Sequence, residues 1–357
     1  MKEVIVSNGT SIEIIDSPIP IPQNGEVLIR VIASGCNPKD CKQTLYLPAA
    51  NSGDDIAGVV EAIGGGVFEF KPGDHVAAFH QMYEPHGSFA EYAIAPAYTT
   101  FHKPTNISFE EATTIPLAFL TAAVALYHDL QLPYPWAGVE DTVGAAPLLI
   151  YGAGTAVGNY ALQLAQRSNL HPIICVAGQS TTQIREFMNP VHGDVVIDYR
   201  LGAEQTVSSI KHALGGKPLL YAFDAVSDHG SDRIIGSVIS PEKSRMSIVQ
   251  PRGRARLPRD FSIPETFRVP ALLGVPDGVD VIYTSVGRVH SSEKQLGFVF
   301  SRYISQGIQE GWFRPHPHEV MPGGLYGVGQ ALENLHHGQV HFSKYVFRIG
   351  DTEGISG

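Results

Sequence analysis

The chain has 357 residues, enough for two domains that each bury a hydrophobic core. Hydrophobic residues make up 43% of it and charged residues 17%, a balance typical of a well-packed globular protein. The formal net charge is −10, and no basic stripe interleaved with aromatic residues occurs, which argues against nucleic acid or an anionic membrane surface as a partner. No long apolar run of a signal peptide follows Met1, so we expect a cytoplasmic protein.

The three cysteines, Cys36, Cys41 and Cys175, are too few for a disulfide framework and suit a reducing compartment. They are also too few for a four-cysteine structural zinc site. Cys36 and Cys41 are either a reactive pair or two buried thiols, and burial is the commoner state of free cysteine.

The first part of the chain has the pattern of a small β-rich domain. Apolar residues alternate with period two around residues 27–31, and further strands are predicted at residues 55–63, 75–79 and 87–94. Short strands at such close spacing favour a barrel-like arrangement.

The pattern changes at Ser108, where Ser108-Phe109-Glu110-Glu111 has the form of a helix capping box. We expect a short helix that ends near Pro116 and a second helix over residues 117–127. Residues 132–146 are rich in proline and glycine and are predicted to form a surface loop.

A glycine-rich turn then follows an apolar run, in the order Leu148–Tyr151 and Gly152-Ala153-Gly154-Thr155-Ala156-Val157-Gly158. A strand, a tight glycine turn and a helix form the unit that presents backbone N–H groups to a pyrophosphate. The glycine spacing is one residue longer than G-x-G-x-x-G, so an ordinary strand-to-helix turn remains the alternative.

Strands and helices alternate after this turn, which predicts a mostly parallel sheet with helices on both faces. Strands are expected at residues 171–177, 194–198, 219–224, 245–249 and 279–283, with helices at 183–188 and 293–310 and an irregular segment at 250–278. The last predicted strand, residues 345–349, has no obvious partner in this sheet. Its return to the first domain would make the nucleotide-binding domain an insertion.

Several motifs, in this order, resemble the medium-chain dehydrogenase/reductase superfamily. They are Asn37-Pro38-Lys39-Asp40, Gly53-Asp54-Asp55-Ile56-Ala57-Gly58, Lys71-Pro72-Gly73-Asp74-His75-Val76, Gly87-Ser88-Phe89-Ala90-Glu91-Tyr92 and Ile115-Pro116-Leu117-Ala118-Phe119-Leu120-Thr121-Ala122. The segment from Trp312 to Gly338 is similar to the trans-acting enoyl reductases of fungal polyketide pathways, such as the lovastatin one. The resemblance implies a Rossmann doubly wound parallel sheet inserted in a GroES-like β-barrel catalytic domain. The implied parts are residues 1–116 (catalytic domain), 117–310 (NADPH-binding domain) and 311–357 (return to the catalytic domain).

The residues at the superfamily's zinc positions argue against a metal. Zinc alcohol dehydrogenases of this superfamily carry a Cys and a His-Glu pair where this chain has Asn37 and Asp54-Asp55. His75, His80 and His86 do not have a recognised ligand spacing and are interpreted as surface or turn residues. We therefore expect no metal, and without a Lewis acid, hydride addition to an activated C=C bond is favoured over alcohol oxidation.

The end of the second predicted strand of the parallel sheet indicates which dinucleotide binds. NAD enzymes place a carboxylate there for the ribose 2′-hydroxyl, whereas residues 176–181 read Val-Ala-Gly-Gln-Ser-Thr. Hydroxyl and amide groups can donate to a 2′-phosphate, and Arg185 lies one helical turn further on. The sequence therefore predicts NADPH as the cofactor.

The resemblance also implies which residues contact the cofactor. They are Lys39, Asp40, Cys41, Lys42, Thr121, Gly154, Thr155, Ala156, Val157, Ala177, Gly178, Gln179, Ser180, Tyr199, Val249, Gln250, His341 and Phe342. His341-Phe342 departs from the family's Ser-Gly before Glu-Lys and keeps only Lys344, which weakens that part of the prediction.

Reduction of an α,β-unsaturated thioester requires a donor near the enolate oxygen and a proton for the α-carbon. By resemblance, Lys42 and Thr121 are the catalytic candidates beside the nicotinamide, and Tyr46 is the nearest phenol that can donate a proton. A solvated lysine and a rim aromatic are the alternatives for Lys42 and Tyr46. Asp54 and Asp55 open a predicted strand, and a structural role is favoured for them over acid–base catalysis.

The resemblance implies an NADPH-dependent enoyl reductase that acts in trans, most simply as a monomer, on a thioester carried by the acyl carrier domain of a polyketide synthase. A cluster of Arg252, Arg254, Arg256 and Arg259 is either a docking patch for that acidic partner or a solvated loop. A stand-alone quinone or alkenal reductase and a non-enzymatic NADPH-binding protein remain alternatives.

Overall fold

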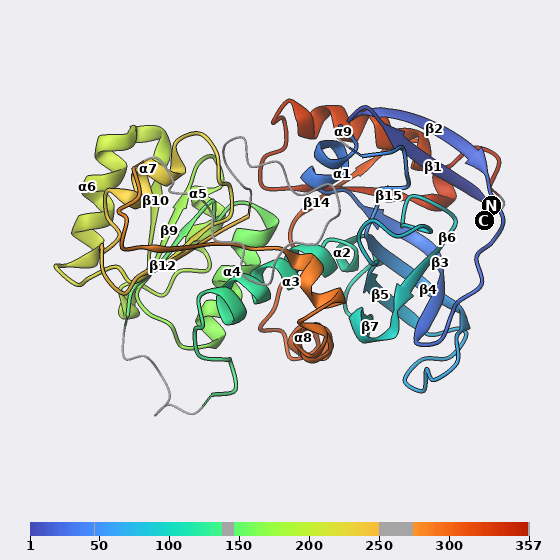
Figure 1. Cartoon of the computed structure of the whole chain (residues 1–357), viewed down its shortest axis with the longest axis horizontal. Coiled ribbons are helices and arrows are strands. Elements are labelled where there is room, and N and C mark those ends of the chain that lie inside the picture. The colour runs from blue at the N-terminus through green and yellow to red at the C-terminus, as the bar shows by residue number, and fades with distance from the viewer. Residues whose placement is uncertain (46, 138–145, 250–273, 356–357) are drawn as a thin grey trace. The chain divides into compact units, whose positions relative to one another are not determined.

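The computed structural model describes residues 1–45, 47–137, 146–249 and 274–355 (Figure 1). The chain divides into two compact units, which are Met1–Leu120 with Gly287–Gly357 and Thr121–Val286. The second unit is thus an insertion in the first, as the sequence indicates. Its limits fall at 120/121 and 286/287, whereas the predicted limits are 116/117 and 310/311.

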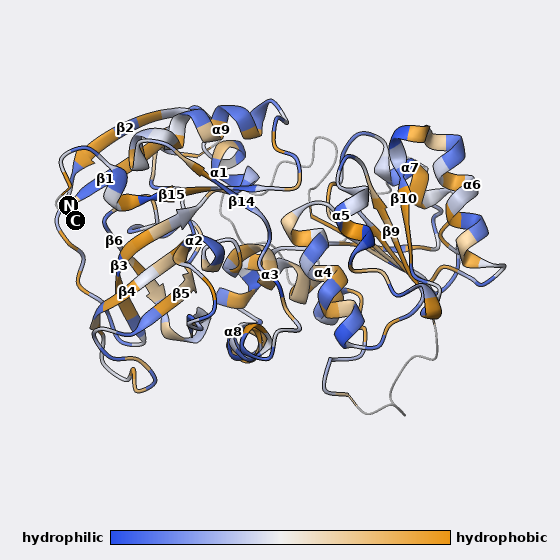
Figure 2. Cartoon of the chain, turned by 180° about the vertical axis from the view of Figure 1, so that it is seen from behind, coloured by the Kyte–Doolittle hydropathy of each residue, from blue (hydrophilic) through white to orange (hydrophobic). Residues whose placement is uncertain are grey.

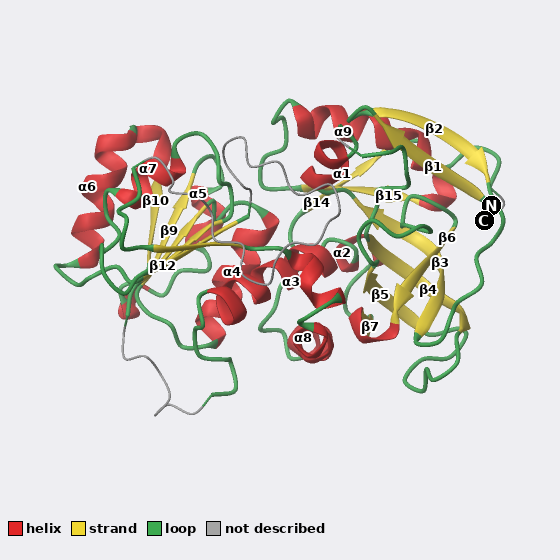
Figure 3. Cartoon of the chain, in the orientation of Figure 1, coloured by secondary structure: helices red, strands yellow, loops and turns green. Residues whose placement is uncertain are grey.

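The first unit is built on a seven-stranded sheet in the order β14-β15-β3-β4-β5-β7, with β6 paired to β3 (Figure 3). Its strands are β3 (Glu26–Gly35), β4 (Asp55–Ile63), β5 (His75–Phe79), β6 (Tyr92–Pro96), β7 (Thr100–His102), β14 (His318–Met321) and β15 (Lys344–Arg348). A hairpin of β1 (Lys2–Ser7) and β2 (Ser11–Asp16) accompanies it. The predicted strands at residues 27–31, 55–63 and 75–79 are confirmed.

Strand β6 begins at Tyr92, five residues later than the prediction for residues 87–94. The residues before it are paired elsewhere: Ser88 N donates to Gly53 O at 2.9 Å, and Val4 N donates to Phe89 O at 2.8 Å. Because these partners lie far away in sequence, the local alternation of residues does not reveal them.

The C-terminal strand β15 joins the first unit, as the sequence predicts. It pairs antiparallel with β3, in the register Phe347↔Ser34, and parallel with β14. The Phe347 side chain is fully buried and lies edge-on to Phe89, with ring centroids 5.5 Å apart. Near the end of the described chain, Gly354 lies beside the N-terminal strand, since a Cβ there would be 3.5 Å from Lys2 Cε.

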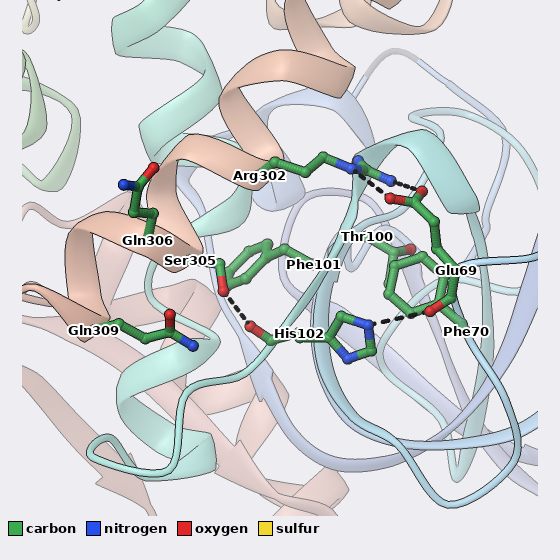
Figure 4. Close-up of a pocket in the computed structure, with 9 residues that line it drawn as sticks. All are labelled: Glu69, Phe70, Thr100, Phe101, His102, Arg302, Ser305, Gln306 and Gln309. Carbon is green, nitrogen blue, oxygen red and sulfur yellow. Dashed lines mark hydrogen bonds and ion pairs between the residues drawn. The ribbon is translucent and has the colours of Figure 1, made fainter.

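The long helix α8 (Lys294–Gln309) also belongs to the first unit, which explains why the boundary lies before it. Arg302 donates to Tyr98 O at 2.8 Å, and Ser305 Oγ donates to His102 O at 2.8 Å. Figure 4 shows these side chains around a cavity of about 210 Å³, where Arg302 also pairs with Glu69. The sequence predicts the helix well, but such contacts decide which unit it joins.

Three short helices lie in or begin in this unit: α1 (Pro38–Gln43), α2 (Phe109–Ala112) and α3 (Pro116–Ala123), which crosses the boundary after Leu120. The capping box is confirmed, since Glu111 N donates to Ser108 Oγ at 3.1 Å and Ser108 N to Glu111 Oε2 at 2.7 Å. Pro116 is the first residue of α3 instead of a stop, because a helix does not use the N–H groups of its first turn.

The helix continues from α3 as the π-helical turn Val124–Asp129. Residues Phe109–Asp129 are long and apolar enough to cross a membrane by length and composition. However, 83% of the 18-residue window that passes this test is buried inside the protein. A core helix passes the same test, and burial indicates that role here.

The second unit is a six-stranded parallel sheet in the order β10-β9-β8-β11-β12-β13. Its strands are β8 (Leu148–Tyr151), β9 (Ile173–Ala177), β10 (Val195–Asp198), β11 (Tyr221–Asp224), β12 (Arg245–Ile248) and β13 (Asp280–Tyr283). Its main helices are α4 (Ala156–Arg167), α5 (Thr181–Arg185), α6 (Ala203–Leu214) and α7 (Ser231–Gly236). Figure 2 shows the strands as largely hydrophobic, as expected for a sheet covered on both faces.

This order confirms the predicted doubly wound fold, and the strand order reverses between β8 and β11. Ligands of such sheets bind at the carboxyl ends of the strands near the reversal. Most of the two predicted irregular segments, residues 132–146 and 250–278, lies outside the described residues.

We expect Phe347→Ala to lower the free energy of unfolding by about 3–5 kcal/mol, because it leaves a cavity under β15 in the core of the first unit. Urea denaturation followed by fluorescence measures the change. Arg348→Ala on the same strand removes a surface ion pair with Glu110 and should change stability far less than Phe347→Ala does. Equal losses for the two variants would contradict this account of β15.

Candidate functional site

The glycine turn after β8 has the geometry of a phosphate-binding cradle. Gly152 has φ +83°, and a Cβ there would lie 2.3 Å from Val226 Cγ2. A Cβ on Gly158 would lie 2.3 Å from Gly152 O, so only glycine lets α4 approach the turn this closely. Thr155 caps α4, since its Oγ1 accepts from Gly158 N at 3.0 Å. The turn and the start of this helix fit a pyrophosphate.

The end of the neighbouring strand β9 forms the next part of the same edge. A Cβ on Gly178 would meet the Tyr199 ring at 2.8 Å, so this ring lies directly against the backbone after β9. The ring is 46% exposed and lies roughly parallel to Tyr151, with centroids 6.3 Å apart. Residues 178–181 contain no carboxylate, and Gln179 is exposed. The structure thus brings Ala177 to Ser180, Tyr199 and the glycine turn together.

Asp224, at the end of β11, orders the loop beside this turn and was not predicted. Its buried carboxylate accepts from Ser227 N at 2.7 Å and from Ser231 Oγ at 2.5 Å. Val226, which abuts Gly152, donates its N–H to the same carboxylate at 3.1 Å. An Asp at the end of a predicted strand with serines after it is the local signal that identifies such a loop clamp.

Of the predicted pair after β12, only Val249 is described. Val249 N donates to Ser227 Oγ at 3.0 Å, which joins the end of β12 to the Asp224 loop. Gln250 lies outside the described residues. Within the second unit, the predicted cofactor residues from Gly154 to Val249 therefore follow strands β8, β9, β10 and β12 at the carboxyl edge of one sheet.

In the first unit, Lys39 lies within a group of acidic residues. Its Nζ is 2.6 Å from Asp40 Oδ1 and 2.5 Å from Asp54 Oδ2, and it donates to Ser52 O at 2.6 Å. The Lys39 side chain is only 16% exposed and that of Asp40 is fully buried. The single ammonium charge thus lies between two buried carboxylates, and one of its hydrogens is donated to a backbone carbonyl.

Burial changes the proton affinity of these groups. It raises the pKa of the Asp40 carboxyl to about 7, and the nearby Asp54 charge adds to the rise against the effect of Lys39. Burial also raises the pKa of Asp54 above its usual range. For Lys39, burial opposes the charged form, but Asp40 and Asp54 outweigh it, and the net pKa is raised.

Asp55 is the acceptor for three separate segments. Its Oδ2 accepts from Lys344 Nζ at 2.5 Å and from Asn37 Nδ2 at 2.6 Å, and its Oδ1 accepts from Leu117 N at 2.7 Å. Lys344 Nζ also donates to Thr114 O at 3.2 Å. The contacts of Asp54 and Asp55 therefore agree with the structural role that the sequence analysis favours for them.

The remaining predicted site residues differ in exposure. Lys42 is exposed in the last turn of α1, whereas Cys41 is buried and its thiol contacts Pro38 O at 3.2 Å. Thr121 is buried near the end of α3. His341 is exposed, and Phe342 has φ +47° just before β15. Tyr46 lies outside the described residues.

All three cysteines are buried free thiols, and burial raises the pKa of each. Among the described residues, no group of three or more His, Cys, Asp or Glu side chains is arranged to hold a metal ion. His80 contacts the carbonyls of Ile94 at 2.7 Å and Glu84 at 3.0 Å through its two ring nitrogens.

Comparison with known proteins shows to which family this chain belongs and which solved structures share its fold. Residues 23–105 match the alcohol dehydrogenase GroES-like domain. The trans-enoyl reductase fsr4 of Gibberella fujikuroi is 42% identical over 330 residues, which cover 92% of each chain. Among solved structures, CurK enoyl reductase has a TM-score of 0.73 at 20% identity and covers 97% of this chain and 98% of its own. Mycobacterial Rv1454c complexed with NADPH has a TM-score of 0.71 at 21% identity and covers 97% of this chain and 99% of its own.

A GroES-like lobe interrupted by a doubly wound parallel sheet with a glycine turn defines a medium-chain dehydrogenase/reductase, an oxidoreductase that uses a nicotinamide cofactor. Within this superfamily, the chain belongs to the trans-enoyl reductase family. The resemblance inferred from its motifs is therefore confirmed.

We expect Lys344→Met to lower the free energy of unfolding by about 3–5 kcal/mol, because it leaves Asp55 buried without its cation. The double variant Asp55→Asn with Lys344→Met should be more stable than the single variant. Lys211→Met, at an exposed position of α6, should change stability by less than about 0.5 kcal/mol. Denaturant titrations measure all three, and a double variant less stable than Lys344→Met would contradict the pairing.

The raised pKa of Asp40 makes stability depend on pH. Between about pH 4 and pH 7 the folded protein keeps a proton that the unfolded chain, with a pKa of 3.8, has released. The contribution of Asp40 to stability therefore falls as the pH rises through this window. The side chain of Asp40→Asn does not titrate. We therefore expect the unfolding free energy of the variant minus that of the unsubstituted protein to increase by at least about 1 kcal/mol from pH 4 to 7. A difference that stays constant across this range would contradict the assignment.

Proposed function

We propose that this protein is an NADPH-dependent enoyl reductase that acts in trans on an α,β-unsaturated thioester carried by the acyl carrier domain of a polyketide synthase. The observation that carries the proposal is the 42% identity to a trans-enoyl reductase over 92% of the chain. The word "trans" in that relative's name implies a partner that holds the substrate. We further propose that the chain works as a monomer beside this synthase.

The choice of NADPH rests on the end of β9. A carboxylate there would hold the 2′-hydroxyl of NADH and repel a 2′-phosphate, and residues 178–181 have none. The structurally similar Rv1454c was solved with NADPH, which agrees with this choice.

The described residues suggest how the cofactor is held. The turn after β8 and the N–H groups at the start of α4 suit the pyrophosphate, and the exposed ring of Tyr199 suits the adenosine end. Val249 and Thr121 are proposed to line the nicotinamide side. When bound, NADPH supplies the hydride that adds to the β-carbon of the substrate.

Lys42 is proposed to stabilise the negative charge that develops on the thioester oxygen. It is the exposed lysine of α1, whereas Lys39 in the same helix is neutralised by Asp40 and Asp54. A hydrogen-bond donor aimed at a developing enolate lowers the barrier without any metal. Tyr46 is retained as the proposed proton donor to the α-carbon. The arginine cluster from Arg252 to Arg259, a candidate docking patch, lies outside the described residues.

The test is NADPH consumption by the purified protein with four substrates: a crotonyl group on a carrier domain, a small crotonyl thioester, an enone and a quinone. We expect the carrier-bound thioester to have the highest kcat/KM, since the partner surface contributes to its binding. Lys42→Met should lower kcat by about 10²-fold through loss of enolate stabilisation, while Lys211→Met stays unchanged.

Rapid turnover of the quinone with no thioester reduction would instead favour a stand-alone quinone reductase. NADPH binding without turnover of any of the four substrates would favour a non-enzymatic binding protein. Unchanged kcat in Lys42→Met would remove that lysine from the mechanism while leaving the substrate class intact.

A further inference from the structure

An ion pair at the carboxyl end of β10 lies beside the segment that distinguishes NADPH from NADH. Arg200 Nε is 2.9 Å from Asp198 Oδ1, and Arg200 Nη2 is 2.6 Å from Asp198 Oδ2. The backbone N–H of Arg200 donates to the same carboxylate at 3.0 Å. Both side chains reach solvent, with 51% of the Arg200 side chain and 22% of the Asp198 side chain exposed.

The strand register places this pair next to residues 178–181. Asp198 is opposite Ala177 in the parallel pairing of β10 with β9. Tyr199, between Asp198 and Arg200, lies against Gly178, the first residue after β9. The end of β9 is where a doubly wound sheet contacts the adenosine ribose. Asp198, the last residue of β10, and Arg200, in the turn that follows, are therefore charged residues beside the expected ribose site.

The two charges have opposite effects on a 2′-phosphate. The Asp198 carboxylate repels it, and the Arg200 guanidinium attracts it. An exposed ion pair contributes little stability, so its cation can change partner at small cost. A phosphate dianion accepts two parallel N–H bonds from a guanidinium and competes well with the single charge of a carboxylate.

Arg185, the other arginine near this edge, is less well placed. It is the last residue of α5 (Thr181–Arg185), and no contact links it to Tyr199 or Gly178 among those found for these two residues. Arg200 directly follows Tyr199, the residue that touches the β9 end.

We propose that Arg200 binds the 2′-phosphate of NADPH by exchanging Asp198 for it, and that Asp198 limits the strength of this binding. In the absence of a 2′-phosphate, Arg200 returns to Asp198 and neutralises it, so that NADH is neither repelled nor specifically held. The inference rests on the proposed use of NADPH and deepens it by naming the residue that selects the cofactor.

The experiment measures dissociation constants of NADPH, NADH, 2′,5′-ADP and 5′-ADP by calorimetry, for the full chain and its variants. The two ADP isomers isolate the adenosine end, so the result does not depend on turnover. We expect Arg200→Ala and Arg200→Gln to weaken NADPH and 2′,5′-ADP by about 10-fold or more and NADH and 5′-ADP by less than about 3-fold. Asp198→Asn should tighten NADPH and 2′,5′-ADP alone. Lys211→Ala, at an exposed position of α6, is the control and should bind all four ligands as the unsubstituted protein does.

The outcomes separate this inference from the proposed function. If the unsubstituted protein prefers NADPH and Arg200→Ala keeps that preference, Arg200 is not the selecting residue, although the enoyl reductase proposal stands. If Arg185→Ala loses the preference for NADPH while Arg200→Ala keeps it, the proposed role of Arg200 is likewise overturned. If the unsubstituted protein binds NADH as tightly as NADPH, the choice of cofactor fails together with the role of Arg200. Thermal melting of each variant checks that the surface substitutions leave the fold intact.

Discussion

The buried carboxylate of Asp55 is the constraint on which the first unit depends. It accepts from Lys344 on the C-terminal strand β15, from Asn37 at the start of α1, and from Leu117 N in the first turn of α3. A buried charge is tolerated only when paired and hydrogen-bonded, so these segments must meet at one point. Asp55 thereby fixes the helix that carries Lys42 and the helix that leads to Thr121.

The second unit depends on close backbone packing more than on charge. Gly152 and Gly158 allow the turn after β8 and the start of α4 to approach within distances that no side chain permits. Asp224 holds the loop that borders this turn through two backbone N–H groups and Ser231. The proposed pyrophosphate site is therefore shaped by the protein's own contacts, and a site formed in advance lowers the entropic cost of binding.

Local sequence patterns predict the helices and strands of this protein well. They predict poorly which distant residues those elements contact. The strands at residues 55–63 and 75–79, the capping box at Ser108 and the glycine turn each follow from neighbouring residues, and the structure confirms them. The start of β6, the attachment of α8 and the ion pair of Lys39 with Asp54 depend on residues distant in sequence. That the charge of Lys39 is paired with Asp54 as well as with the adjacent Asp40 is a contact that no local rule indicates.

The same ion pairs bear on which chemistry the first unit supports. Asn37, Asp54 and Asp55 stand where zinc dehydrogenases of the superfamily, by resemblance, carry ligands, and here two ammonium groups are paired with the carboxylates. A divalent cation placed among them would be repelled by Lys39 and Lys344, and displacing either lysine would leave its charge buried. The proposed role of Lys42 agrees with this arrangement, because α1 buries Lys39 between carboxylates and leaves Lys42 exposed.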